Sequence, residues 1–71
     1  MEERLTNTLK VERAKRDLTQ AALAGLIGVT RKSINAIELG HMVPSTLLAL
    51  RLARALDTTV EALFHIESGH A

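Results

Sequence analysis

The chain has 71 residues, of which 46% are apolar and 24% are charged, and its net charge is +1. This length is enough for one domain, and this composition is typical of a folded globular protein. The absence of cysteine excludes disulfides and thiolate metal sites. No apolar run approaches the roughly 20 residues of a membrane span, and the first ten residues lack the apolar stretch of a secretory signal. We therefore expect one cytoplasmic domain over residues 1–71.

Charge is distributed unevenly along the chain. Between Lys10 and His41 six cations face three anions, whereas from Ala55 onward there are three anions and no lysine or arginine. A molecule with one basic end can meet phosphate groups with that end. The asymmetry is compatible with a nucleic-acid partner, although short helices also segregate charge by chance.

The first of five expected helices covers residues 3–16. Leu5 and Leu9 lie four apart in this segment, and Arg13 continues the same stripe. The vocabulary of strands is almost absent from the chain, which has one Phe and neither Tyr nor Trp. Asp17 and Leu18 are expected to break this helix.

Each of the other four helices follows a residue that can cap it by accepting from a free backbone N–H. These caps are Thr19, Thr30, Ser45 and Thr59, and the helices are expected at residues 20–27, 31–39, 46–56 and 60–64. Gly28 and Gly40 should end the second and third helices. The fourth is apolar nearly all round and should form the centre of the core, and residues 65–71 are expected to be a tail. The expected fold class is all-α, a compact bundle of five helices.

Residues 19–40 carry the strongest functional signal. Two short helices meet there at Gly28-Val29, a turn too short for antiparallel packing, so they should cross steeply as in a helix-turn-helix. The second of them opens with Arg31 and Lys32, where the positive end of the helix dipole makes a cation unfavourable by about 0.3–1 kcal/mol. An exposed helix that begins with two cations is suited to duplex DNA, although a solvated surface turn is the alternative.

Six polar side chains of this segment could touch DNA. Arginine is the best bidentate partner for guanine, so Arg31 and Lys32 are candidates for contacts to bases. Ser33 and Asn35 lie on the outer side of the same helix and could bond to a base or a phosphate. Thr19 and Gln20 open the second helix, where free N–H groups form a seat for phosphate. Simple capping and ordinary surface polarity are the alternatives for these residues.

Arg13 and Glu38 form a candidate ion pair. Each lies on or beside the apolar stripe of its helix, where a lone buried charge would be very costly. If the first helix packs behind the third, the two charges can neutralise each other. Two independent surface charges are the alternative.

The run from Leu9 to Ile66 resembles the lambda-repressor-like, Cro/Xre family of helix-turn-helix regulators. The matching segments are residues 18–20, 23–24, 28–31, 33–38, 40, 43–45 and 60–64, which read LTQ, LA, GVTR, SINAIE, G, VPS and VEALF. The resemblance implies that Gln20 binds phosphate, that Thr30 and Ser33 contact backbone or bases, and that Arg31 and Lys32 read the major groove. It also supports the pair of Arg13 with Glu38.

The chain departs from the family pattern at three places. Glu12 stands where relatives usually carry an aliphatic residue, and Gly25 inside the second helix costs about 1 kcal/mol relative to alanine. His41, Met42 and Val43 replace more basic or polar loop residues, so fewer phosphate contacts are expected from this loop, with His41 as the candidate.

A homodimer is expected because one small domain discriminates poorly between sequences, each mismatch costing about 1–3 kcal/mol. A two-fold axis would place half-sites about 34 Å apart. The candidate dimer surface lies at the carboxyl end of the chain and comprises Val60, Leu63, Phe64 and Ile66. Inward packing on the fourth helix is the alternative for these residues.

We therefore expect a double-stranded DNA-binding transcriptional regulator, a repressor acting as a homodimer on a palindromic operator in a bacterial or phage-type cytoplasm, associated with the nucleoid. An antitoxin-type repressor with a protein partner, or a protein-interaction adaptor, are the alternatives. No catalytic site, metal, cofactor, membrane or small-molecule ligand is expected, since none of His41, His65 and His70 pairs with a carboxylate at catalytic spacing. With one aromatic residue, single-stranded nucleic acid is disfavoured.

Overall fold

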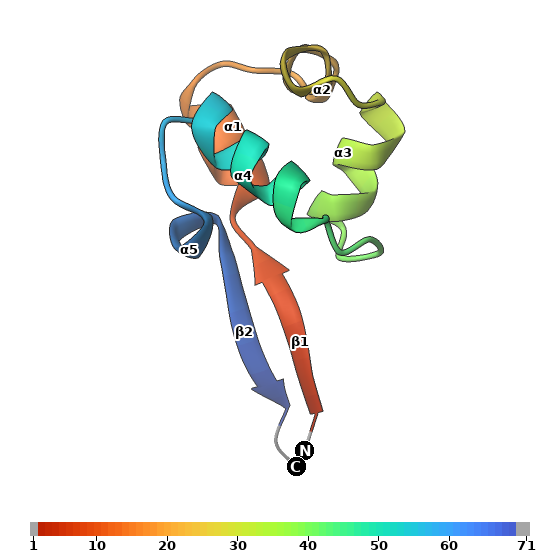
Figure 1. The fold of residues 1–71 in the computed structure, drawn as a ribbon, viewed down its shortest axis with the longest axis vertical. Helices are drawn as coiled ribbons and strands as arrows, with labels where there is room; N and C mark the ends of the chain where they lie inside the picture. The colour runs from red at the N-terminus through yellow and green to blue at the C-terminus, as the bar shows by residue number, and fades with distance from the viewer. Residues whose placement is uncertain (1, 70–71) are drawn as a thin grey trace.

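The computed structural model describes residues 2–69, which form five helices and a ribbon of two strands (Figure 1). The elements follow one another as β1 (Glu2–Asn7), α1 (Leu9–Lys15), α2 (Gln20–Ile27), α3 (Arg31–Glu38), α4 (Thr46–Ala55), α5 (Val60–Leu63) and β2 (Phe64–Gly69). The helices pack together at one end, and the ribbon projects from them. The molecule is therefore elongated, with principal extents of 39 × 21 × 21 Å.

The all-α prediction is wrong, because the two ends of the chain pair as an antiparallel sheet. Leu5 lies opposite Ile66 and Asn7 opposite Phe64 in this register. The helix expected at residues 3–16 therefore begins only at Leu9, and the tail expected at residues 65–71 is a strand as far as Gly69. Residues 70 and 71 lie outside the described part of the chain. Strand pairing is favoured over a helix here because it packs Leu5 against the core. A helical turn in this segment would have only this one apolar residue to bury, too little to stabilise it.

The four predicted caps are confirmed. In each case the hydroxyl oxygen accepts from the backbone N–H three residues on: Thr19 from Ala22, Thr30 from Ser33, Ser45 from Leu48 and Thr59 from Ala62. Gly28 follows α2 with a φ of +77°, the left-handed conformation that glycine adopts without strain. These devices fix where each helix begins and where α2 gives way to α3.

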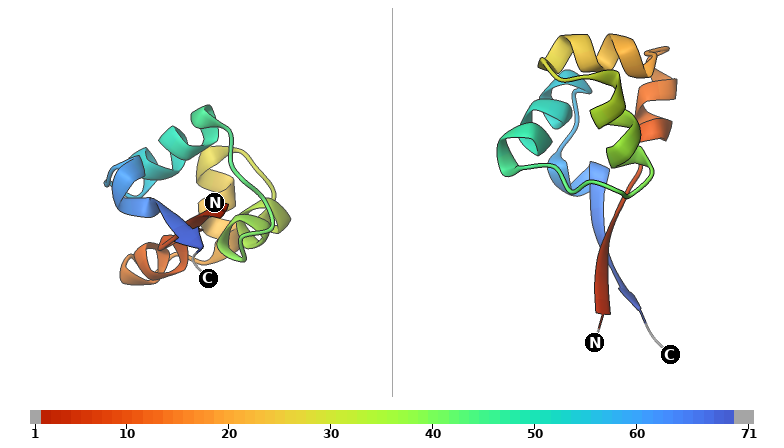
Figure 2. Two further views of the ribbon diagram at one scale, coloured as in Figure 1. Left: turned by 90° about the horizontal axis from the view of Figure 1, so that it is seen from below. Right: turned by 90° about the vertical axis from the view of Figure 1, so that its right-hand side faces the viewer.

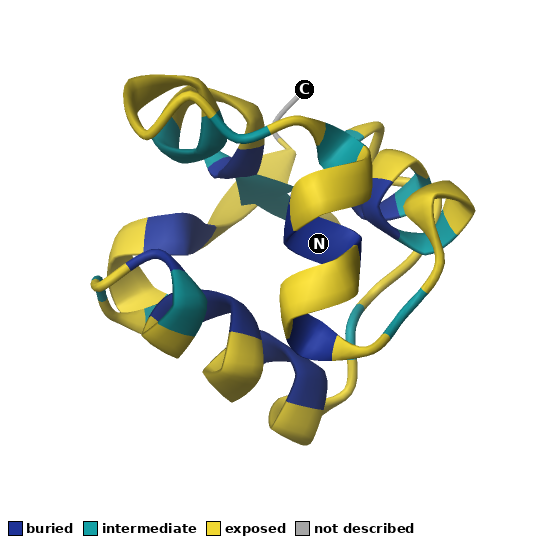
Figure 3. Cartoon of the chain, turned by 90° about the horizontal axis from the view of Figure 1, so that it is seen from above, coloured by how far each residue is buried: buried dark blue, intermediate teal, exposed yellow. Residues whose placement is uncertain are grey.

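The core lies between the five helices. Its seven fully buried large side chains are Leu9, Leu23, Ile34, Ile37, Leu52, Leu56 and Leu63. Leu47 and Leu50 of α4 are 58% and 56% exposed, so this helix buries one face and not its whole circumference, as Figure 3 shows by colour along the cartoon. The core thus fixes the backs of α2 and α3 and leaves their outer faces in solvent.

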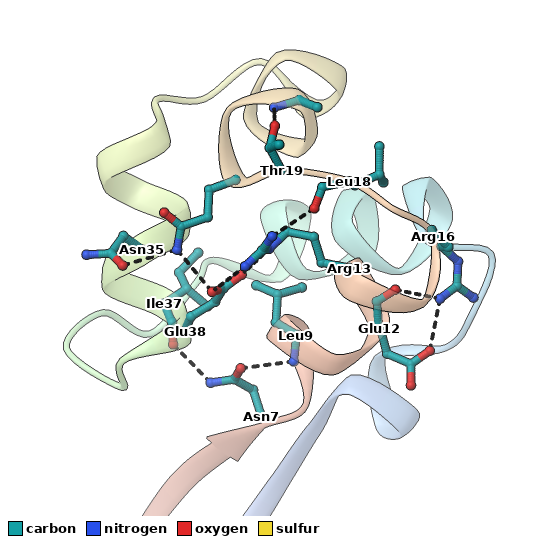
Figure 4. A network of polar contacts seen from close by, with 12 residues as sticks. Asn7, Leu9, Glu12, Arg13, Arg16, Leu18, Thr19, Asn35, Ile37 and Glu38 are labelled. Atoms are coloured by element: carbon teal, nitrogen blue, oxygen red, sulfur yellow. Dashed lines mark hydrogen bonds and ion pairs between the residues drawn. The ribbon is translucent and has the colours of Figure 1, made fainter.

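Asn7 joins the ribbon to the helices. Its Oδ1 accepts from the Leu9 N–H at 3.1 Å, and its Nδ2 donates to the carbonyl of Ile37 at 2.9 Å (Figure 4). One side chain therefore satisfies the first turn of α1 and holds it to the last turn of α3. The ribbon and α3 are rigidly connected at this point.

Candidate nucleic-acid interface

The corner formed by α2 and α3 is the candidate interface. The two helices contact each other and cross at a steep angle, with α2 running across the amino-terminal end of α3 (Figure 2, right). The turn between them is closed by N–H groups of Gly28 and Val29, which both donate to the carbonyl of Ala24, at 2.9 and 3.0 Å. The predicted helix-turn-helix geometry is therefore present.

Arg31 and Lys32 are exposed in the first turn of α3. Within residues 2–69 neither side chain has an ion pair or a hydrogen bond. Beside them, Thr30 Oγ1 and Ser33 Oγ share a hydrogen bond of 3.1 Å. Because one hydroxyl donates to the other, one hydroxyl proton of this pair remains available to an acceptor outside the protein. The tip of α3 thus presents positive charge and a free hydroxyl donor.

Thr19 and Gln20 stand at the start of α2. The Thr19 hydroxyl accepts from Ala22 N–H at 3.0 Å, which leaves its own proton free to donate. The side-chain amide of Gln20 points inward, donating to Glu38 Oε1 at 3.0 Å and to Asn35 Oδ1 at 3.1 Å. Both amide hydrogens are therefore engaged within the protein.

Arg13 and Glu38 lie at the centre of the network drawn in Figure 4. Arg13 Nε donates to Glu38 Oε2 at 2.8 Å, its Nη2 donates to Oε1 at 3.3 Å, and its Nη1 donates to the carbonyl of Leu18 at 2.8 Å. The side chains of Arg13 and Glu38 are only 14% and 6% exposed. One guanidinium thus holds α1, the loop before α2 and the end of α3 together.

The ion pair keeps Glu38 charged. Burial alone would raise the pKa of this carboxyl, but the hydrogen bonds from Arg13 and Gln20, with the positive charge of Arg13 and Lys10, outweigh it and hold the pKa below its ordinary value. The hydrogen bond to Glu38 raises the pKa of Arg13. At neutral pH Glu38 is therefore a carboxylate and can only accept hydrogen bonds.

This charge state fixes the orientation of two amides. Since Glu38 only accepts, the Gln20 Nε2 group must face it, and its second hydrogen then reaches Asn35 Oδ1. Asn35 is exposed on α3, and with its oxygen turned to Gln20 it directs its Nδ2 group away from the protein (Figure 4). The outer face of α3 therefore offers an oriented donor at Asn35.

Sequence reasoning did not find this amide chain or the carbonyl of Leu18 as a partner of Arg13. Gln20 and Asn35 lie on different helices, 15 positions apart, and no spacing rule connects them. A polar residue at the start of one helix and another on the outer face of the next was the only signal present.

The remaining predicted residues fall in two places. His41 is exposed in the loop after α3, and its backbone N–H donates to the carbonyl of Ala36 at 2.8 Å. Of the four residues expected at a dimer contact, Leu63 and Phe64 are buried in the core of their own chain and Val60 is partly buried. Ile66 is 69% exposed on the ribbon.

Residues 9–63 match the family model described as helix-turn-helix. The chain is 40% identical over 63 residues to a protein named the uncharacterized HTH-type transcriptional regulator YgzD of Bacillus subtilis, covering 89% of this chain and 96% of that protein. It is 41% identical over 63 residues, with the same shares, to the similarly named MJ0272 of Methanocaldococcus jannaschii. The crystal structure of the restriction-modification controller protein C.AhdI of Aeromonas hydrophila matches with a TM-score of 0.72 at 33% identity, covering 76% of this chain and 82% of that chain.

The corner of α2 and α3 and its exposed cations define a DNA-binding protein of the helix-turn-helix class. The chain belongs to the Cro/C1-type (Xre-like) helix-turn-helix family of transcriptional regulators. Its relatives carry the name of regulators and not of enzymes.

Residues 2–69 contain neither a helix that could span a membrane nor a cluster of residues that could hold a metal ion. None of the helices there has the length and apolar character needed to cross a bilayer. In the same residues, three or more acidic, histidine or cysteine side chains nowhere gather as a metal site.

Replacing Glu38 by alanine is expected to lower the free energy of unfolding by about 3–5 kcal/mol, because Arg13, whose side chain is only 14% exposed, is left charged and without its carboxylate. Chemical denaturation followed by circular dichroism measures this loss. The control is Glu12→Ala, which removes the pairs with Lys15 and Arg16 on α1, whose side chains are 63% and 32% exposed, and should cost much less than Glu38→Ala. Equal losses in the two variants would contradict the conclusion that the Arg13–Glu38 pair stabilises the packing of α1, α2 and α3.

Proposed function

We propose that this protein is a sequence-specific repressor that reads the major groove of duplex DNA with the amino-terminal end of α3. The observation that carries the proposal is the exposure of Arg31 and Lys32 at a helix end where cations lower stability. A helix tip selected for stability alone would carry acidic residues there. Two cations with no partner in residues 2–69 are complementary to an anion outside the protein.

Base recognition is proposed for Arg31, Lys32, Ser33 and Asn35. The guanidinium of Arg31 can donate to both O6 and N7 of guanine. Asn35 offers its Nδ2 group, because its oxygen is held by Gln20. It should therefore select an acceptor such as N7 of a purine or O4 of thymine, and disfavour the amino group of cytosine.

Phosphate contacts are proposed for Thr19, Gln20, Thr30 and His41. The hydroxyls of Thr19 and Thr30 lie at helix starts, and the exposed His41 lies in the loop after α3. For Gln20 the inward direction of the side chain leaves the backbone N–H as the donor, in the first turn of α2, where the helix dipole favours an anion. These contacts would fix the register of α3 in the groove.

A homodimer is proposed to read a palindromic operator, with a second copy covering an apolar face. A groove between α4 and α5 is lined by Pro44, Leu50 and Val60, and it continues onto Leu5 at the base of the ribbon. Ile66 lies directly opposite Leu5 on the same face of the ribbon and is 69% exposed. An isologous contact would bury Ile66 of each copy against the other and double the length of DNA that is read. Bound across a promoter in the cytoplasm, such a dimer would block transcription by occupying the DNA.

Replacing Arg31 by alanine is expected to weaken binding to the selected operator by about 1–3 kcal/mol and to relax the preference at one base pair. The operator comes from selection of bound duplexes out of a random pool. Fluorescence anisotropy on this duplex and on a scrambled duplex then measures both effects. The control is Lys15→Ala, a cation on α1 paired with Glu12, which should leave the ratio of the two affinities unchanged. If Arg31→Ala loses affinity equally on both duplexes, Arg31 contacts only the backbone.

Replacing Ile66 by aspartate is expected to convert the dimer to a monomer at micromolar concentration while the fold is kept, because this side chain is mostly in solvent within one copy. Sedimentation velocity measures the mass. Val11→Asp places the same charge at another exposed apolar site, on α1, and should remain dimeric. A wild-type chain that is monomeric at every concentration would refute the palindromic operator.

A further inference from the structure

A second surface lies at the opposite end of α2 from Gln20. Here the carboxyl end of α2 and the last turns of α4 form an open groove, lined among others by Gly25, Leu26, Arg51 and Arg54. We call it the arginine groove. It has no role in the DNA contacts proposed above, so its composition needs its own explanation.

The two arginines of this groove have no partner within residues 2–69. Arg4, Arg13 and Arg16 form ion pairs with Glu67, Glu38 and Glu12. The arginines without an ion pair in that range are Arg31, at the tip of α3, and these two exposed side chains of α4. Arg51 and Arg54 are three residues apart, so they lie on one face of α4, about 4.5 Å apart along its axis. The groove therefore presents a matched pair of guanidiniums.

Helix dipoles do not cancel this charge. The carboxyl ends of α2 and α4 each contribute about half a unit of negative charge near the groove, and Arg54 in the last turn of α4 partly balances it. The two positive charges of the guanidiniums exceed the combined negative charge of the two helix ends. The nearest acidic residue along the chain, Asp57, forms no ion pair with either arginine in the described residues. The groove is left with net positive charge.

Neither packing nor backbone conformation within the chain requires a glycine at position 25. A Cβ at this position would meet nothing within 4 Å, and the backbone there is not in the left-handed region that requires glycine. Glycine inside a helix is less favourable than alanine. The next residue, Leu26, is 64% exposed. One wall of the groove thus combines a bare helix surface with an unburied apolar side chain.

We propose that the arginine groove binds an acidic amphipathic helix of a protein partner. Two carboxylates one helical turn apart on the partner would pair with Arg51 and Arg54, and an apolar side chain between them would pack on Leu26 over the bare backbone at Gly25. A DNA phosphate would satisfy the arginines, but it would use neither Leu26 nor Gly25. None of the residues that line the groove is among those proposed above to contact DNA, so the partner and DNA use different side chains.

The test uses the full chain labelled with ¹⁵N and a blocked acidic amphipathic peptide of about fifteen residues, long enough to form a helix. Its glutamates lie one turn apart beside leucines, and a control peptide carries glutamines in their place. At low ionic strength the acidic peptide should shift the amide signals of residues 25–28 and 51–55 and leave those of residues 33–38 unchanged. The glutamine peptide should bind at least about tenfold more weakly, since it lacks charge to pair with the arginines.

Two variants separate binding from folding. R51E/R54E should lose peptide affinity by at least about tenfold, whereas the charge-matched R4E/K15E, at two exposed positions outside the groove, should keep the peptide. These two double variants should lose the same affinity for operator DNA, since they change the net charge equally. Gly25→Gln should raise the midpoint of thermal unfolding by about 4 °C, because it strengthens α2, and still weaken the peptide by filling its place. Absence of peptide binding to the wild-type chain, or equal binding to R51E/R54E, would overturn the proposal. If R51E/R54E instead loses more DNA affinity than R4E/K15E and keeps the peptide, the groove is a phosphate contact.

Discussion

Arg13 and Glu38 carry opposite charges in a place where water barely reaches either of them, and three segments of the chain meet on this pair. The guanidinium binds the carboxylate at the end of α3 and the carbonyl of Leu18 before α2. Removing two charges from water is costly, and only a bidentate contact with further hydrogen bonds repays that cost. The pair has both, and it joins α1, the loop before α2 and the end of α3 through directional hydrogen bonds, which apolar side chains such as Leu23 and Ile34 cannot make.

The same pair governs the chemistry of the outer surface. Its charge state holds Glu38 as an acceptor, Gln20 must then present its amino group, and Asn35 is left with its donor toward solvent. A buried electrostatic contact is in this way converted into a hydrogen-bonding pattern on α3. The strongest stabilising contact, the Arg13–Glu38 pair, lies on the inner side of the corner formed by α2 and α3. In the first turn of α3, Arg31 and Lys32 lower stability slightly because they lie at the positive end of the helix dipole. The free-energy cost of placing two cations at the positive end of the α3 dipole is small compared with the cost of breaking the Arg13–Glu38 pair.

Local chemistry made most of the helical part predictable. Each cap accepts a hydrogen bond from the backbone N–H three residues further on, and the role of Gly28 depends only on its own backbone conformation. Both features can therefore be recognised within a short stretch of sequence. The ribbon could not be recognised in this way, because Leu5 and Ile66 pair from opposite ends of the chain with no turn sequence to announce them. The alternation of Phe64 and Ile66 with polar neighbours was a visible strand signal, but without a partner in view it resembled a tail. The Gln20–Asn35 contact likewise depends on how two helices cross, which the sequence does not show.

The claim that the Arg13–Glu38 pair orients Asn35 for DNA recognition through Gln20 is tested most directly by a double-mutant cycle. DNA affinity for the selected operator is measured for Gln20→Ala, Asn35→Ala and the double variant. If Gln20 orients Asn35, the loss caused by Gln20→Ala should largely disappear once Asn35 is alanine, giving a coupling energy of about 1 kcal/mol or more. Additive losses within about 0.5 kcal/mol would show that the two side chains act independently, and would contradict the account.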